Sequence, residues 1–236
     1  FEPTPESKIK EAVEIKKANF VAGSITYPRY LDRDPHGSSF QKIDQSYNKR
    51  LLDQIQKDYP DLKRAFYMQC FLDTSDDGPE RFPNDRVFRP DGTQADYGRS
   101  TMKLYFPTLD NAWGRNNQET VRILLDQLKV NAIYWDEFER SAAKWHYGEP
   151  WDRVSGDIDR NSGKLLRKKT SITLISQPYR LKTIRQFKAA GLPVVANGSA
   201  MTRTMGAENI QRFVESASIS NCLQAILYSP VSLGCH

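Results

Sequence analysis

Three acidic residues close an apolar run in the middle of the chain and could carry acid and base chemistry. The segment from Asn131 to Glu139 has the sequence NAIYWDEFE, in which Asp136, Glu137 and Glu139 alternate with aromatic residues. Hydrolysis of a glycosidic bond needs two carboxyl groups, one charged and one holding its proton. Adjacent aromatic rings raise the pKa of an acid by excluding water and offer stacking faces to sugar rings. We therefore expect Asp136 to be the central carboxylate, acting as nucleophile or base.

The identity of the acid stays open at this point. Glu137 could donate the proton or orient Asp136, and the loop that follows offers Asp157 and Asp159 as alternatives. Neighbouring residues on a regular strand point to opposite faces, so Asp136 and Glu137 share a cleft only if the strand has already ended. A different interpretation is that the carboxylates cap the first turn of a helix, where acidic side chains are favoured.

The elements that would position these residues alternate between helix and strand over the 236 residues, a length that suits one large domain. Periodicity predicts helices over 6–17, 47–59, 118–129, 179–190 and 207–217, and strands over 20–27, 64–72, 131–136, 171–176, 192–197 and 223–228. A seventh extended piece, 101–107, has no clear place in the sheet. Helices of ten to fifteen residues between strands favour parallel β-α-β units.

The parallel sheet is expected to close into a barrel. No strand is followed by a glycine-rich phosphate-binding turn, and nearly every strand ends in polar or aromatic residues, as in barrels that build their site from strand ends. We therefore predict an α/β protein with a single (β/α)8-type TIM barrel over residues 1–236, incomplete or irregular at its N-terminal side. Its expected substrate contacts come from strand ends and from the loops 74–100 and 139–169: Tyr27, Asp73, Trp135, Glu139, Trp145, His146, Trp151, Gln177, Asn197, Arg203 and Tyr228. For each tryptophan, packing in the core or in a loop is the alternative.

Three pieces of the chain carry a resemblance to a known superfamily. IYWDEF ending at Phe138, Trp151-Asp152 followed by GDID ending at Asp159, and VVANG ending at Gly198 resemble the strand-end signatures of TIM-barrel glycoside hydrolases of the α-galactosidase kind. The resemblance covers mainly residues 100–235. It implies a carbohydrate-active site at the C-terminal face of the barrel, with Asp136 where such barrels keep a catalytic carboxylate.

One position departs from that pattern. In α-galactosidase-like barrels the acid arrives two strands after the nucleophile, and here that position is Asn197, which cannot supply a proton in that way. The sequence therefore leaves two hypotheses: a glycosidase acting on a polysaccharide or oligosaccharide, and a non-catalytic carbohydrate-binding or structural protein on the same barrel.

Composition limits the other partners. The net charge is +5 and the basic residues are scattered along the chain, and we interpret their densest run, Arg167-Lys168-Lys169, as a solvated edge rather than a nucleic-acid surface. No run of eighteen apolar residues exists, so we expect no membrane span. No cofactor or zinc motif is present, so we expect no cofactor and no metal site. Of three cysteines, Cys70 lies in an apolar strand as a buried thiol. The chain begins at Phe1 without a signal-type segment, so we expect a processed protein or a piece of a longer one. With a carbohydrate as the expected substrate, the expected location is secreted or extracellular. The oligomeric state is left open.

Overall fold

The computed structural model describes residues 6–23, 34–214, 219, 223 and 234–235. Within these residues, six strands form one sheet in which every neighbouring pair is parallel. In spatial order they are β1 (Phe20–Gly23), β2 (Lys63–Met68), β5 (Ala132–Trp135), β10 (Val194–Asn197), β11 (Gln211–Val214) and the two-residue β12 (Gly234–Cys235). Along the chain, β1, β2, β5, β10 and β11 are joined in turn by connections that contain helices, as expected for parallel β-α-β units.

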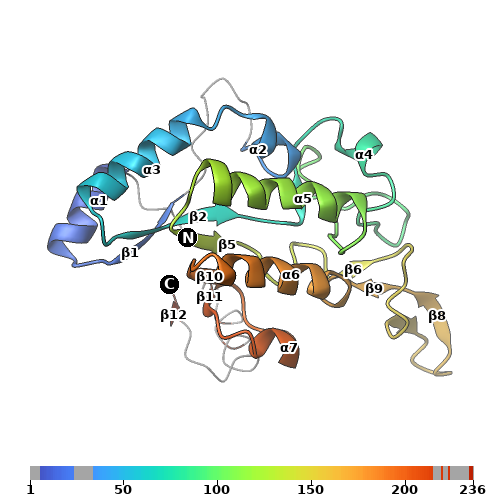
Figure 1. Cartoon of the computed structure of the whole chain (residues 1–236). Coiled ribbons are helices and arrows are strands. Elements are labelled where there is room, and N and C mark those ends of the chain that lie inside the picture. The colour runs from blue at the N-terminus through green and yellow to red at the C-terminus, as the bar shows by residue number, and fades with distance from the viewer. Residues whose placement is uncertain (1–5, 24–33, 215–218, 220–222, 224–233, 236) are drawn as a thin grey trace.

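The helices lie along the sheet, with α3, α5 and α6 running roughly parallel to it (Figure 1). They are α1 (Glu6–Lys10), the π-helical η1 (Glu11–Ile15), α2 (Ser38–Lys42), α3 (Ser46–Asp58), α4 (Gly78–Arg81), α5 (Ala112–Arg122), the π-helical η2 (Ile123–Gln127), α6 (Ile172–Ala189) and α7 (Arg203–Gly206). Three antiparallel pairs extend beyond the sheet: β3 (Leu72–Asp73) with β4 (Lys103–Leu104), β6 (Trp145–His146) with β9 (Thr170–Ser171), and β7 (Gly156–Ile158) with β8 (Leu165–Lys168).

The two faces of the sheet have different partners because side chains alternate along a strand. Phe66, Met68, Ile133 and Trp135 face the helices and belong to the main core, which also takes in buried side chains of α2, α3, α5 and α6. Ala65, Tyr67, Ala132, Tyr134, Val195 and Phe213 form a second cluster on the opposite face. Helices on one side and a separate aromatic lining on the other are the arrangement of a barrel wall.

The predicted parallel α/β architecture is therefore confirmed, and the described residues form an open half-barrel rather than a closed eight-stranded barrel. The strands predicted over 131–136 and 192–197 and the helix predicted over 47–59 agree with β5, β10 and α3 to within two residues. The strand predicted over 64–72 divides instead into β2 and β3, and 101–107 contributes β4 to a pair outside the main sheet. The final strand, predicted over 223–228, lies outside the described residues apart from Leu223.

The strand predicted over 171–176 is wrong, because this segment starts α6. Ser171 caps the helix by accepting a hydrogen bond from the backbone N–H of Leu174. Burial recurs at helical spacing, with Ile172, Ser176, Tyr179 and Arg180, Thr183 and Ile184, and Phe187 all buried. The segment contains the β-branched residues Ile172, Thr173 and Ile175, which suit a strand, whereas packing against the sheet favours the helix.

The helix predicted over 207–217 is also wrong, since residues 211–214 form β11 beside β10. Ile210, Phe213 and Val214 have helical spacing in the sequence, but pairing with β10 sends Arg212 to the helix-facing side and Phe213 to the other. Tertiary pairing has overridden a local pattern that was ambiguous. Among the described residues, no helix is both long and apolar enough to cross a membrane.

Candidate functional site

Asp136 lies directly after β5 and is surrounded by hydrogen-bond donors. Its Oδ1 accepts from Asn197 Nδ2 at 2.7 Å and from Tyr134 Oη at 3.1 Å. The same oxygen accepts from the backbone N–H of Glu137 at 3.0 Å, while Oδ2 accepts from Tyr67 Oη at 3.1 Å. Asp136 is the acceptor in each of these bonds, which suits an ionised carboxylate. Oδ2 receives fewer of these donors and is therefore the oxygen more available to a bound molecule.

These partners come from three neighbouring strands and share the face of the sheet opposite the helices. The register pairs Tyr67 of β2 with Tyr134 of β5, and their ring centroids are 5.8 Å apart. Phe213 of β11 continues the lining, with its ring centroid 5.5 Å from that of Tyr134. Asn197 ends β10 opposite Phe213. Asp136 thus stands at the carboxyl edge of an aromatic floor, in which Tyr134 and Phe213 are buried and Tyr67 is half-buried.

Glu137 is brought beside Asp136 because the strand has already ended. Its backbone has a positive φ of 47°, a conformation uncommon for a residue with a side chain. The carboxyl oxygen Oε2 accepts from Gln69 Nε2 at 2.6 Å and from Ser141 Oγ at 2.5 Å. Burial raises the pKa of Glu137 to about 7, the nearby charge of Asp136 adds to the increase, and the Ser141 hydroxyl opposes it. Burial and the neighbouring charge therefore favour the protonated form of Glu137 relative to a glutamate in water.

His36 approaches the same group from the segment before α2. Its ring centroid lies 5.5 Å from that of Tyr67, and its backbone N–H donates to Thr74 Oγ1 at 2.9 Å. Burial lowers the pKa of the imidazole, and the negative charges of Asp34 and Asp136 act in the opposite direction. The neutral ring can both donate and accept a hydrogen bond near the tyrosine that contacts Asp136.

Glu139, expected to contact the substrate, is instead buried in an ion-pair cluster. Its carboxylate pairs with Arg180 of α6 at 2.6 Å and with Arg212 of β11 at 3.4 Å, and the Arg180 side chain is fully buried. Both guanidinium groups lie over the ring of Phe138, at 5.5 and 4.9 Å from its centroid. This cluster connects the loop after Asp136 and Glu137 to α6 and to β11.

Three other residues expected at the site are buried among protein partners. Trp135 faces the helices, with its ring packed edge-on against Phe138, because it alternates with Tyr134 and Asp136 along the chain. The ring nitrogens of His146 lie 3.0 Å from the backbone N–H of Phe88 and 3.1 Å from a backbone carbonyl oxygen, so the ring bridges two loops. Asp73 accepts from the backbone N–H of Ser38 at 2.9 Å and anchors the start of α2.

The predicted residues of the loop 139–169 lie on or beside the β7–β8 hairpin. Asp157 pairs with Lys169 at 2.7 Å on the base of that hairpin. Lys169 also lies over the ring of Trp145, 4.2 Å from its centroid, and Lys168 lies 4.7 Å from the centroid of Trp151. None of these contacts joins the three residues to Asp136, so the structure does not bring Asp157 to the central carboxylate.

Two further predicted residues, Gln177 and Arg203, belong to helices. Gln177 lies within α6, where its side-chain oxygen accepts from Thr202 Oγ1 at 2.5 Å. Arg203 is the exposed first residue of α7. Tyr27 and Tyr228 lie outside the described residues.

Sequence reasoning missed several residues that contact the carboxylates. Tyr67 and Gln69 bind Asp136 and Glu137, respectively, yet they lie at and just after the end of β2, 69 and 68 positions earlier in the chain. A signal was present in the repeated spacing: Tyr67 precedes Gln69 by two residues just as Tyr134 precedes Asp136. Residues two apart on parallel strands share a face, so the repeat predicts a layered lining.

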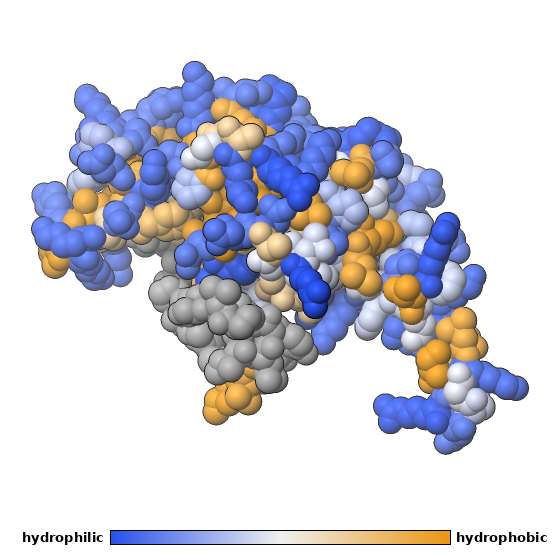
Figure 2. Space-filling view, turned by 60° about the horizontal axis from the view of Figure 1, so that its bottom comes forward, coloured by the Kyte–Doolittle hydropathy of each residue, from blue (hydrophilic) through white to orange (hydrophobic). Residues whose placement is uncertain are grey.

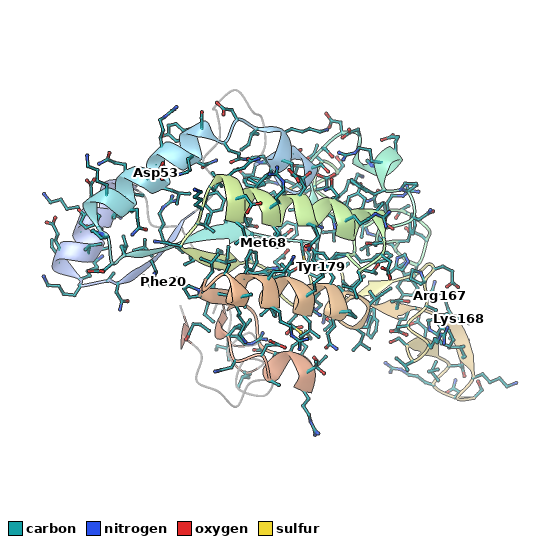
Figure 3. The ribbon with its side chains drawn as sticks, in the orientation of Figure 1. Phe20, Asp53, Met68, Arg167, Lys168 and Tyr179 are labelled. Carbon is teal, nitrogen blue, oxygen red and sulfur yellow. The ribbon has the colours of Figure 1, made fainter. Side chains whose placement is uncertain are left out.

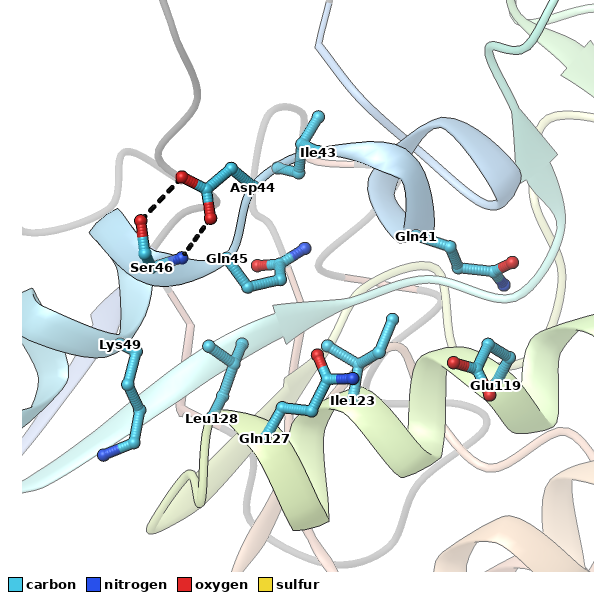
Figure 4. A pocket seen from close by; sticks show the side chains of 10 residues that line it. All are labelled: Gln41, Ile43, Asp44, Gln45, Ser46, Lys49, Glu119, Ile123, Gln127 and Leu128. Atoms are coloured by element: carbon cyan, nitrogen blue, oxygen red, sulfur yellow. Dashed lines mark hydrogen bonds between the residues drawn. The ribbon is translucent and has the colours of Figure 1, made fainter.

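A hollow on the helical side of the molecule is distinct from this group. It has a volume of about 470 Å³ and lies between the α2–α3 connection and the segment formed by α5 and η2 (Figure 4). Its polar walls already have protein partners: Asp44 accepts from Ser46, and Glu119 pairs with Arg122 at 2.5 Å. The strand-end group around Asp136 therefore remains the candidate site.

Comparison with solved structures agrees with the half-barrel architecture. An α-galactosidase from Geobacillus stearothermophilus, solved in complex with stachyose, superposes with a TM-score of 0.58 at 14% identity, over 98% of this chain and 32% of that one. An α-galactosidase from Lactobacillus brevis superposes with a TM-score of 0.57 at 11% identity, over 94% of this chain and 29% of that one. A ligand-free α-N-acetylgalactosaminidase from Bifidobacterium bifidum superposes with a TM-score of 0.53 at 12% identity, over 97% of this chain and 34% of that one.

At 11 to 14% identity, these likenesses show the fold alone. The chain spans about a third of the length of each of these proteins. No protein-family model matches the sequence, and no curated protein matches it.

Proposed function

We propose that this chain carries the sugar-binding and catalytic face of a glycoside hydrolase-like barrel, with Asp136 as the ionised carboxylate and Glu137 as the proton donor. The observation that carries the proposal is the contrast between these neighbours. Asp136 accepts hydrogen bonds from two phenols and an amide, while burial raises the pKa of Glu137 to about 7. One charged and one protonated carboxyl group are the pair that glycosidic cleavage needs.

The surrounding side chains support this division of roles. Asn197, Tyr67 and Tyr134 hold the Asp136 carboxylate by donating to it, so its orientation does not depend on a bound sugar. Gln69 and Ser141 fix the Glu137 carboxyl group on one oxygen. Positioned acids and bases of this kind contribute about a hundred-fold to ten-thousand-fold to catalysis. The solved glycosidases with the same fold add a carbohydrate substrate to the proposal.

A non-catalytic sugar-binding protein is the second candidate, and Asn197 favours it. Asn197 ends β10, the strand next to β5, and its amide donates to Asp136 at 2.7 Å, so this neighbouring strand end offers Asp136 an amide and not a second carboxyl group. Such a protein would keep the aromatic floor and the hydrogen-bonding groups but would release no product. The two candidates therefore differ in turnover and agree in binding.

Turnover on a panel of aryl α-galactosides, aryl N-acetyl-α-galactosaminides and natural oligosaccharides tests the proposal, with products followed by mass spectrometry. We expect Asp136→Asn to abolish hydrolysis, and Glu137→Gln to retain more activity on substrates with a good leaving group, which needs no protonation. Asp157→Asn is the matched control, and it should leave turnover unchanged. Loss of activity in the control, or full activity in Asp136→Asn, contradicts the assignment. Binding of a glycan to the native chain without any product favours the second candidate.

A further inference from the structure

The β7–β8 hairpin forms an arm that stands off from the body of the protein, and its surface is unlike the rest. We define the arm as residues 153–169. It projects at the end of the molecule opposite Phe20 (Figures 1 and 3), beyond the carboxyl ends of the strands. Its shape is held from within, since Arg167 pairs with Asp157 at 3.0 Å and Asp159 accepts from the backbone N–H of Ser162 at 2.7 Å.

The arm exposes large aliphatic side chains on both of its strands. Val154 is 75% exposed, Ile158 53%, Leu165 50% and Leu166 66%. Figure 2 shows hydrophobic side chains gathered on the projection at the lower right, between hydrophilic ones. Single exposed aliphatic residues are ordinary on protein surfaces, but four within thirteen residues of one projecting hairpin mark an interaction surface.

Most of the net positive charge of the chain is also on the arm. Residues 153–169 contain six lysines and arginines and two aspartates, a formal charge of +4, whereas the whole chain has +5. Arg153, Arg160, Lys164 and Lys168 are exposed. Trp145 and Trp151 lie at the base of the arm, each with a lysine over its ring. The surface thus combines cations, aliphatic side chains and indole rings on a convex projection.

We propose that the arm docks the protein onto a membrane surface that contains anionic phospholipids. Cations attract the headgroups, aliphatic side chains gain free energy by entering the boundary with the acyl chains, and indole rings favour the interface. An acidic glycan would satisfy the cations but would leave the leucines in water. A protein partner would more often be met by a groove than by a hairpin that is convex and apolar on both strands. The proposal concerns peripheral attachment and is independent of the activity at Asp136.

Vesicle flotation of the full chain tests this attachment. The vesicles contain either phosphatidylcholine alone or phosphatidylcholine with one-third phosphatidylglycerol, at several salt concentrations. We expect binding to the anionic vesicles at least ten-fold tighter than to the neutral ones, weakening as salt rises. Arg160→Ser with Lys164→Ser removes two exposed cations from the turn and should weaken binding by about thirty-fold, because each cation near such a surface contributes roughly a factor of five.

A second double variant, Leu165→Ser with Leu166→Ser, tests the aliphatic contribution and should also weaken vesicle binding by more than ten-fold. Matched controls remove two exposed cations and two exposed leucines elsewhere on the surface: Lys57→Ser with Lys182→Ser, and Leu109→Ser with Leu174→Ser. Both controls should bind within two-fold of the native chain. Circular dichroism checks that each variant is folded. If the leucine variant does not fold, the variant Arg160→Ser with Lys164→Ser still tests the proposal.

Three results would overturn the proposal. Equal binding to neutral and anionic vesicles excludes recognition of anionic lipid. Equal losses in the arm variants and the controls assign any binding to overall charge. Binding of heparin or polygalacturonate that depends on Arg160 and Lys164, together with vesicle binding that does not change when the leucines are replaced, assigns the arm to an acidic polymer instead.

Discussion

Replacing Glu139 by glutamine tests whether the loop that holds Asp136 and Glu137 is fixed by buried charge. The change keeps the shape of the side chain but removes the negative charge between Arg180 and Arg212, which are both buried. Breaking a buried ion pair by removing one partner typically costs about 3 to 5 kcal/mol. The guanidinium of Arg180 keeps its hydrogen bonds to Ser176 Oγ and to a backbone carbonyl oxygen, so we expect the lower end of that range, about 3 kcal/mol.

For a protein of this size, about 3 kcal/mol corresponds to a fall in Tm of roughly 6 to 12 °C. Urea and thermal unfolding followed by circular dichroism would measure it. Glu208→Gln is the matched control, because Glu208 also bridges two cations, Arg185 and Lys188, whose side chains are 66% and 44% exposed. We expect the control to cost less than about 1 kcal/mol. If the two variants lose the same stability, burial of the Glu139 cluster is not what fixes the loop.

Two further predictions concern stability and its dependence on pH. The pKa of Glu137 is raised from 4.5 to about 7, so the folded protein binds the proton more tightly than the unfolded chain does. This contribution to stability is complete below about pH 4.5 and is lost as pH rises through about 7. Glu137→Gln should remove that part of the pH dependence in urea unfolding at pH 5 and 7.5, and an unchanged slope would contradict the raised pKa. Asn111 caps α5 by accepting from the backbone N–H of Gly114 at 2.8 Å. Asn111→Ala should therefore lower the free energy of unfolding by about 1 kcal/mol, whereas Asn161→Ala, in an exposed turn, should change it little; equal effects would argue against the cap.

Much of the architecture could be predicted from local patterns. Runs of apolar residues that end in polar ones located β5 and β10, and amphipathic spacing located α3, because these elements bury a face that the sequence itself repeats. The parallel arrangement followed from the alternation of helices and strands. Two elements near the C-terminal end were assigned wrongly. Ile172 to Ser176 and Gln211 to Val214 have residue types that suit either structure, and contact with the rest of the protein decides between them.

The residues of the candidate site were likewise predictable from the sequence only in part. The sequence alone singled out Asp136 and Glu137, since carboxylates after an apolar strand are a local feature. It could not show that Tyr67 and Gln69 reach them, because those contacts depend on how β2 and β5 align. Nor could it separate Glu139 from its neighbours, although burial between two arginines gives that residue a different role.

The order of residues thus determined which segments form strands and where acidic groups emerge from them. Only the tertiary structure decided which carboxylate is surrounded by phenol and amide donors, which one has its pKa raised by burial and which one is held in a buried ion pair. The physical reason is that hydrogen bonding and burial at each carboxylate are supplied by side chains distant in the sequence, and their positions are fixed by strand register and helix packing.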